Sequence, residues 1–459
     1  MPFDPVAILL IDIPDVEEGI TLSWRDLAGF PKAGYRRARV YLCHAGVPYA
    51  KLSVDLDDQG FPLESFPGLP RAARGNLAAG DPLREWPSNS PLVTVIVSTS
   101  GSRPDLLERC IKSLRMLMYP AFEIVVIDNR PPSITDESED VWTDTGGVDG
   151  VVAKGVTIVR EERLGLSFAR NAGVLAARGE IVAFTDDDVE VDANWLGGIV
   201  NAFDRSPEVM CVTGLVVPAE LETEAQEFFE NYYGGFERGL VPRTWIIPNR
   251  SLRNRPFLSR SSFFVSESGS PEPSSPKSLY VLAGNCGVGA NMAVRREIAL
   301  RFPFDVALGA GSIVNSGEDT RFFVDVLWAG HAIAYVPSSI VRHTHRRDMD
   351  GLKIQIRRMG MGLTALLTSL IVRDARHLVG IVLGGAPSAP LRWTRSAISG
   401  QSVAEGRDQR RSYPSTLRRT ELVGQLLGPW RYFLSRRHLH SLERASVKRE
   451  QGKPFVEPS

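Results

Sequence analysis

The sequence has little cysteine, almost no net charge and no apolar run long enough to cross a membrane. Its 459 residues include four cysteines that lie far apart and form no Cys-x-x-Cys pair. Neither a disulfide framework nor a zinc site is therefore indicated, and buried thiols are expected. A formal net charge of −1 argues against a general nucleic-acid-binding protein. Residues 1–5 lack the basic start and apolar core of a signal peptide, so a cytoplasmic location is expected.

Two apolar runs follow one another late in the chain. Met359–Val372 is almost wholly apolar and Leu378–Leu383 is apolar again, but neither reaches the roughly 18 to 20 residues that a bilayer-spanning helix needs. Buried core helices are the simplest interpretation. The alternative is an interfacial helix that makes peripheral contact with a membrane, at the inner face of the plasma membrane.

Composition and periodicity divide the chain into three parts. Residues 1–90 contain short strand patterns between Gly and Pro residues and predict a small β-rich accessory domain. Residues 91–350 alternate apolar strands with helical patterns, which predicts an α/β fold with a mainly parallel sheet. Within them, residues 250–278 are rich in Ser, Pro and Arg and predict a mobile insertion. Residues 351–459 predict a helical, basic C-terminal extension.

Three consecutive carboxylates, Asp186, Asp187 and Asp188, follow the apolar strand pattern of Ile181–Phe184. An unpaired charge is unfavourable at the end of a buried strand, so acids in this place need a reason. Two carboxylates at positions i and i+2 can share one hard divalent cation, which keeps open positions for phosphate oxygens. Ligands of open α/β sheets bind beyond the carboxyl ends of the strands. The pattern therefore favours a metal-diphosphate site over a solvated acidic turn.

Other polar residues stand at comparable places, each with a simpler explanation beside the functional one. Asp128 ends the second strand and suits a ribose hydroxyl or a base N–H, although a turn-forming Asp is equally common there. Glu318 and Asp319 begin a predicted helix, where acids also favour the helix dipole. His343 and His345 alternate along a strand-like segment, so both imidazoles could face one site unless they are simply exposed.

These features occur in the order and spacing of one known family. Between Leu92 and Arg347 the chain resembles glycosyltransferase family 2, whose members are inverting enzymes with the Rossmann-like GT-A fold. Residues 218–235 are also similar to actinobacterial-type members with an N-terminal extension. The segments that carry the resemblance are Val93–Thr99, Glu123–Asn129, Gly165–Asn171, Phe184–Asp188 with Trp195, Gly289–Arg296 and Glu318–Asp319.

The resemblance implies a site for a nucleoside-diphosphate sugar, with a UDP-sugar as the default donor. Asp186 and Asp188 match the DxD motif, in which Asp188 would bind Mg²⁺ or Mn²⁺ and Asp186 would join the metal or the ribose. A late histidine, either His343 or His345, would complete the metal sphere or touch the diphosphate. The residues implied on the donor side are Ser98, Thr99, Asp128, Arg170, Asn171, Asp186 and Asp187.

On the acceptor side, the resemblance implies Asp319 as general base and Glu318 as its neighbour and a ligand of the acceptor. Asp319 would take a proton from a hydroxyl of a glycan or glycolipid as that oxygen attacks the anomeric carbon. One alternative is sugar transfer to a polyprenyl phosphate, which needs no proton abstraction. The other is a nucleotide-sugar-binding protein without turnover, in which loss of the metal or base carboxylate would be expected.

Two departures from the family pattern bear on the donor base. Ser98-Thr99 stands where Pro-Thr is usual, and Asn129-Arg130-Pro131 follows Asp128 in place of Asp-Gly-Ser. They leave the base preference open without changing the type of reaction.

Overall fold

A computed structural model gives the architecture of most of the chain. The residues that it describes are 3–12, 35–56, 86–87, 89–131, 155–248, 263–269, 276–383 and 414–451.

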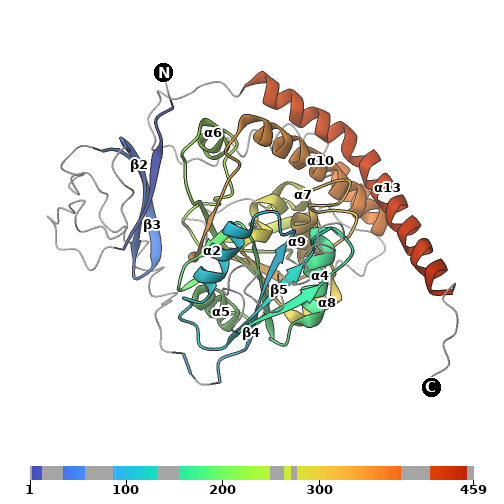
Figure 1. Ribbon diagram of the computed structural model, residues 1–459, viewed down its shortest axis with the longest axis horizontal. Helices are drawn as coiled ribbons and strands as arrows, with labels where there is room; N and C mark the ends of the chain where they lie inside the picture. Colours follow the sequence, from blue (N-terminus) through green and yellow to red (C-terminus); the bar gives the residue numbers. More distant parts are fainter. Residues whose placement is uncertain are drawn as a thin grey trace.

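The largest unit of the fold is an eleven-stranded sheet (Figure 1). Its strands are β4 (Val93–Thr99), β5 (Phe122–Asp128), β6 (Val156–Arg160), β7 (Ile181–Asp186), β8 (Val189–Val191), β9 (Val209–Pro218), β10 (Arg243–Ile246), β11 (Phe264–Ser268), β12 (Lys277–Ser278), β13 (Met292–Arg295) and β14 (Ala332–His343). They lie in the order β12-β11-β10-β14-β9-β13-β7-β4-β5-β6, and β8 pairs with β14 beside this path.

Parallel pairing is confined to two parts of this sheet. Strands β7, β4, β5 and β6 are parallel neighbours, as are β9 and β14. Strand β13 runs antiparallel between β7 and β9 and joins the two parts. The α/β fold class is as the sequence predicts, and the sheet is parallel around the predicted site but mixed as a whole.

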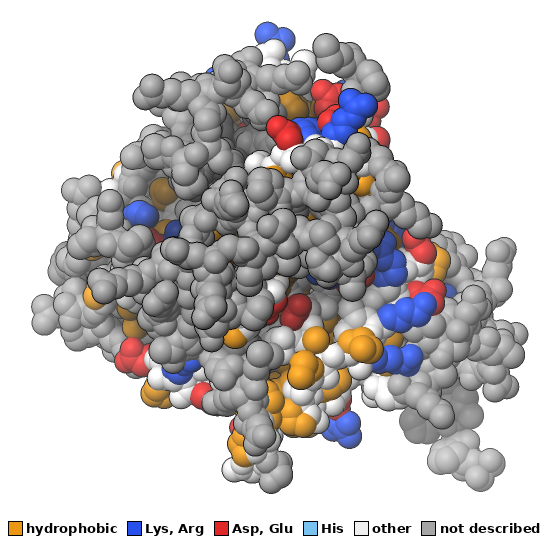
Figure 2. Space-filling view, turned by 90° about the vertical axis from the view of Figure 1, so that its left-hand side faces the viewer, with side chains coloured by type: hydrophobic (Ala, Val, Ile, Leu, Met, Phe, Trp, Pro, Cys, Tyr) orange, Lys and Arg blue, Asp and Glu red, His pale blue; other side chains and the backbone are white. Residues whose placement is uncertain are grey.

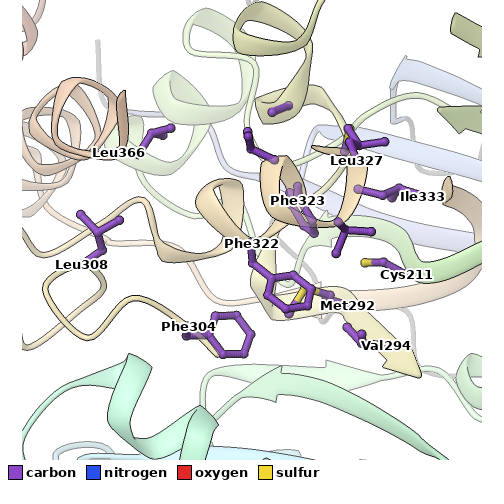
Figure 3. Close-up of a cluster of buried hydrophobic side chains, with 14 of the residues drawn as sticks. Cys211, Met292, Val294, Phe304, Leu308, Phe322, Phe323, Leu327, Ile333 and Leu366 are labelled. Atoms are coloured by element: carbon purple, nitrogen blue, oxygen red, sulfur yellow. The ribbon is translucent and has the colours of Figure 1, made fainter. Parts of the chain in front are cut away.

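Helices pack on both sides of the sheet. They are α2 (Pro104–Leu114), α4 (Leu166–Ala176), α5 (Trp195–Arg205), α6 (Glu224–Tyr232), α7 (Leu279–Leu282), α8 (Arg296–Arg301) and α9 (Glu318–Trp328), with 3₁₀ turns η6 (Ala283–Asn285) and η7 (Gly289–Asn291). Figure 3 shows part of one core, in which side chains of α9 pack against those of β9, β13 and β14. Phe322, Phe323 and Leu327 of α9 are fully buried there, which fixes the start of α9 against the sheet.

A second, three-stranded sheet is formed by β1 (Val6–Asp12), β2 (Arg37–His44) and β3 (Val47–Asp55). β2 is parallel to β1 and antiparallel to β3. Tyr41 and Cys43 of β2 are buried against Leu215, Val217 and Ile340 of the large sheet.

On the face of the molecule in Figure 2, described acidic and basic side chains lie beside one another rather than forming a single basic surface.

The C-terminal part is helical: α10 (Met349–Arg373), α11 (Arg376–Leu383) and α13 (Ser415–Gln451). Helices α10 and α13 lie side by side, and α13 follows the rim of the molecule (Figure 1). The apolar run from Met359 belongs to α10, where Leu363, Leu366 and Leu370 are buried. Among the described helices, none combines the length and the apolarity needed to span a bilayer.

The range predicted as a mobile insertion, 250–278, lies partly outside the described residues. Its described parts include β11 and β12, which extend the edge of the large sheet. Phe263 and Val265 are buried on one side, and this alternation gives the segment a core-facing strand in spite of its Ser and Pro content.

Candidate active site

The ends of four strands meet at one edge of the large sheet. In the parallel register, Thr99 of β4 lies opposite Asp128 of β5, and Ser98 lies opposite Asp186 of β7. β14 reaches the same edge through β8, because His343 pairs with Val189 directly after the Asp triplet. The topology thus gathers residues that are far apart in the sequence at the strand ends.

Asp186, Asp188 and His343 form a cluster with the geometry of a metal site. Each offers one ligand atom, and these atoms lie within 4.8 Å of one another. The Nε2 atom of His343 is 3.5 Å from Oδ1 of Asp188. Burial lowers the pKa of His343, although Asp188 opposes this, and the neutral imidazole is the form that binds metals. Two carboxylates and an imidazole are a ligand set that could hold a divalent cation.

Asp187, the middle carboxylate, is not among the residues of this cluster. Its Oδ2 accepts a hydrogen bond of 2.7 Å from the hydroxyl of Thr99. Burial raises the pKa of Asp187 to about 6, against the opposing charge of Arg103. Thr99 and Asp187, which were both predicted on the donor side, therefore hold the turn that carries Asp186 and Asp188.

Arg103, which the sequence reasoning missed, is a cation that contacts the Asp triplet. Its guanidinium donates to Oδ1 of Asp187 at 2.7 Å and to Oδ2 of Asp188 at 2.6 Å. Arg103 is the residue before the first turn of α2, directly beyond the end of β4. An arginine at the first strand-to-helix turn was the available signal, because that turn opens on the same edge as the Asp triplet.

Arg170 of α4 joins the cluster to the acid pair. Its Nη2 lies 3.2 Å from Oδ1 of Asp186, and its Nη1 lies 2.9 Å from Oε1 of Glu318. Arg170 is almost fully buried, so both carboxylates stabilise a charge that has little contact with water. Burial, together with the charge of Asp319, raises the pKa of Glu318 to about 7.

Asp319 is held at the first turn of α9. Its Oδ2 accepts a hydrogen bond from the backbone N–H of Gly289 at 2.9 Å, and its Oδ1 accepts one from the N–H of Thr320 at 2.6 Å. Gly289 must be small, because a Cβ there would lie 2.6 Å from the guanidinium of Arg170. The predicted segment that begins at Gly289 thus lies between Arg170 and the acid pair.

The carboxylate of Asp128 is enclosed by arginines. Arg130 donates to both of its oxygens at 2.9 Å, and Arg160 donates to Oδ1 at 3.0 Å. Burial would raise the pKa of Asp128, but the hydrogen bonds from Arg130 lower it. Arg130 is one of the residues that depart from the family pattern, and it occupies the carboxylate that was expected to face a base or ribose.

Two further predicted donor residues have other surroundings. Asn171 donates to the carbonyl of Phe304 at 3.0 Å and accepts from its N–H at 2.9 Å, so its side chain fixes a loop. The hydroxyl of Ser98 is buried and has no hydrogen-bond partner among the described residues.

His343 and His345 have different partners although their rings are 5.1 Å apart. Nε2 of His345 is 2.8 Å from Oε1 of Glu230 in α6, and Arg39 of β2 donates to the other oxygen of Glu230 at 2.9 Å. Of the two histidines between which the sequence left the choice open, the structure brings His343 to Asp186 and Asp188 and pairs His345 with a carboxylate elsewhere.

Comparison with known proteins gives a family for this strand-end arrangement. Residues 94–262 match the family model described as glycosyl transferase family 2. Over this region the chain is similar to glycosyltransferase family 2. Its matched region includes β4, β5 and the Asp triplet, and so covers most of the donor-side residues of the site.

Curated relatives are similar to this chain over only part of their length. A glucosyl-dolichyl phosphate glucuronosyltransferase from Haloferax volcanii is 28% identical over 151 residues, which are 32% of this chain and 46% of that protein. An N-acetylgalactosaminyltransferase 7 from Drosophila melanogaster is 24% identical over 272 residues, or 58% of this chain and 41% of that protein. The chain thus spans less than half the length of either relative.

Among solved structures, a mannosyltransferase from Pyrobaculum calidifontis in complex with GDP-Man and Mn²⁺ is 17% identical, with a TM-score of 0.44. That match covers 78% of this chain and 94% of the other.

Proposed function

We propose that this protein is an inverting glycosyltransferase that moves a sugar from a nucleoside-diphosphate sugar to an acceptor hydroxyl. The observation that carries the proposal is the double contact of Arg170 with Asp186 and Glu318, at 3.2 and 2.9 Å. One buried guanidinium links a metal-type cluster to an acid pair. A donor diphosphate on the cluster and a nucleophile beside the acid pair would therefore be neighbours, as a direct displacement requires.

The donor side of the proposal rests on the cluster of Asp186, Asp188 and His343, whose ligand atoms lie within 4.8 Å of one another. These three residues would hold Mg²⁺ or Mn²⁺. When bound, the ion supplies positive charge that stabilises the diphosphate as it leaves. Arg103 contacts Asp188 and supplies a second positive charge at the same edge of the sheet.

The acceptor side of the proposal assigns the general base to Asp319. Hydrogen bonds from Gly289 and Thr320 orient its carboxylate and leave it lone pairs for a proton. The acceptor oxygen would form its bond to the anomeric carbon as the bond to the diphosphate breaks, with the acceptor proton going to Asp319. Burial raises the pKa of Glu318 to about 7. The carboxyl group of Glu318 can therefore carry a proton near neutral pH and donate a hydrogen bond to the acceptor.

The base of the donor is proposed as uracil, and the surroundings of Asp128 indicate which edge of a base would face it. Arg130 and Arg160 occupy the carboxylate of Asp128, so a base at this position would meet arginine N–H groups before it meets Asp128. Acceptor groups on a base edge would fit these donors better than an imide N–H does.

A hydroxyl of a glycan or glycolipid is the proposed acceptor, and sugar transfer to a polyprenyl phosphate is the second candidate. A phosphate acceptor is already ionised and needs no base. The chain has two acids that could serve a hydroxyl acceptor: Glu318, which is buried, and Asp319, which is held by the N–H of Gly289. The name of one relative includes glucosyl-dolichyl phosphate and that of another an N-acetylgalactosaminyl group, so the two names together do not decide between acceptors.

The proposal is tested by release of nucleoside diphosphate from UDP-, GDP- and dTDP-sugars with Mn²⁺ or Mg²⁺. We expect metal-dependent release from one donor, and a loss of roughly 10²-fold or more in Asp319→Asn and in Asp188→Ala. Glu190→Ala is the matched control, because Glu190 lies two residues beyond Asp188 and pairs with Arg109 on the surface. If calorimetry with metal present detects no binding of any of these donors, the transferase assignment is wrong.

A further inference from the structure

Helix α13 carries a row of large apolar side chains on its outward face. Leu426 is 82% exposed, Trp430 63% and Phe433 48%, and Leu422 and Val423 are also exposed. Steps of four, four and three residues from Leu422 to Phe433 place these side chains along one face of the helix. A soluble protein rarely exposes so many large apolar groups together without a partner for them.

The opposite face of α13 is closely packed, which fixes the direction of the exposed row. Gly424 and Gly428 lie so near the backbone of α10 that a Cβ at either would collide with it, the first at Arg357 and the second at Met361. A Cβ at Gly360 of α10 would in turn lie 2.5 Å from the carbonyl oxygen of Glu421. Small residues every fourth position allow this close approach, so α13 cannot rotate to bury its apolar row.

Charges along the same row are of one sign. Arg419 precedes the apolar stretch by one turn, and Arg437 and Arg444 follow it at helical spacing, all of them exposed. Glu421 is the only acidic residue from Ser415 to Leu442, and its side chain is buried. The face therefore reads basic, apolar, basic over a helix of 37 residues, which is about 55 Å long.

We propose that this face of α13, defined by Arg419, Leu422, Leu426, Trp430, Phe433, Arg437 and Arg444, docks on the surface of a bilayer that contains anionic lipids. Trp430 and Phe433 would enter the boundary between headgroups and acyl chains, and the arginines at both ends would meet lipid phosphates. A lipid surface fits better than a protein because the apolar groups stand on a convex helix rather than in a groove. The helix would lie along the membrane, which agrees with the finding that no described helix could span one.

Helix α10 connects this face to the acid pair. It packs against α13 on one side, and on the other a Cβ at Gly317, the residue before Glu318, would lie 2.9 Å from the carbonyl oxygen of Gly362 of α10. On the proposed transferase function, docking would hold the acid pair near acceptors that are anchored in the same membrane. The docking itself does not depend on that function.

The test is flotation of the purified full chain with vesicles of phosphatidylcholine alone or mixed with phosphatidylglycerol. We expect the chain to float with the anionic vesicles, less so as salt is added, and the double variant Leu426→Glu/Trp430→Glu to lose at least about tenfold in binding. The matched control is Leu175→Glu on α4, which makes the same change at a side chain that is 72% exposed. Arg437→Gln/Arg444→Gln should reduce binding to anionic vesicles only.

Three results would overturn the proposal. The first is absence of flotation with either kind of vesicle, and the second is equal loss of binding in the Leu175 control and the double variant. The third is concentration-dependent association of the free chain in light scattering that the double variant abolishes, since the face would then join two copies. Thermal melts show that each variant is folded, and donor binding without vesicles reports separately on the transferase site.

Discussion

The strand-end site and the pair of helices α10 and α13 differ in which side chains they bury and which they expose. At the site, charged groups such as Arg170 and Glu318 are buried and satisfy one another. On α13, apolar groups such as Leu426 and Trp430 are exposed and arginines stand at the ends of the row. Both arrangements oppose the ordinary preference for apolar interiors and charged surfaces, and each is retained where binding is proposed. The difference teaches that the first region depends on partners inside the protein, whereas the proposed partner of the second lies outside it.

The largest expected effect comes from breaking the buried charges of the site. Arg170→Met should destabilise the protein by roughly 3–5 kcal/mol, because Asp186 and Glu318 lose the cation between them. Urea unfolding followed by circular dichroism measures the change. Arg178→Met is the control, since that arginine is exposed and its ion pair with Glu123 should contribute little to stability. Equal losses in the two variants would refute this account of Arg170.

The next effect tests the packing that directs the outer face of α13. Gly428→Ala places a methyl group against Thr364 and the backbone of α10, which should cost about 1–3 kcal/mol. Gly351→Ala, where the atoms nearest to the added methyl belong to the side chain of Asp348 rather than to backbone, should be nearly neutral in the same melting experiment. A neutral Gly428→Ala would mean that α10 and α13 are packed less closely than described.

A smaller, pH-dependent effect is expected at the interface of these helices. Burial raises the pKa of Glu421 from its ordinary value of 4.5 to about 7. Between these two pH values the folded state keeps the proton on Glu421, whereas the unfolded state has released it. Stability therefore falls as pH rises from about 4.5 to 7, and the loss is complete above that range. Glu421→Gln should be more stable than the parent by roughly 2 kcal/mol at alkaline pH and equal to it in acid. A stability difference that does not vary with pH would contradict this assignment.

The smallest effect contrasts most sharply with the first. Leu426→Ser should leave the free energy of unfolding within about 0.5 kcal/mol of the parent, because an exposed side chain has no internal partner to lose. Thermal melts in the absence of lipid measure this. A loss comparable to that of a buried leucine would show that Leu426 is covered within the protein.

The alternation of strands and helices, and the acids that follow the strands, could be predicted from the sequence, because buried strands have continuous apolar patterns and their ends are marked by the polar residues that follow. The α/β fold and the placing of Asp186 and Asp188 follow from that local signal. The pairing of β8 with β14, which brings His343 to Asp188, is a long-range contact that has no local pattern.

Other features were hidden because they depend on which side chains a charge meets. Arg130 stands only two residues after Asp128, yet whether it folds back onto that carboxylate depends on burial that spacing does not reveal. Arg103 could have been noticed at the first strand-to-helix turn, but an exposed arginine is the common case. The row on α13 is visible at helical spacing only after the packing of Gly424 and Gly428 shows which face is turned outward.

The contact between Arg39, Glu230 and His345 limits how far this protein can be treated as modular. Burial alone would raise the pKa of Glu230, but the hydrogen bond with His345 and the charge of Arg39 lower it to about 2. Strand β2 therefore supplies a counter-charge to a carboxylate of α6. The histidine that pairs with this carboxylate, His345, stands two residues along the chain from His343 of the metal-type cluster. Exchange of the first three strands between relatives would have to carry Arg39 and Glu230 together, so these two positions should change in concert over evolution.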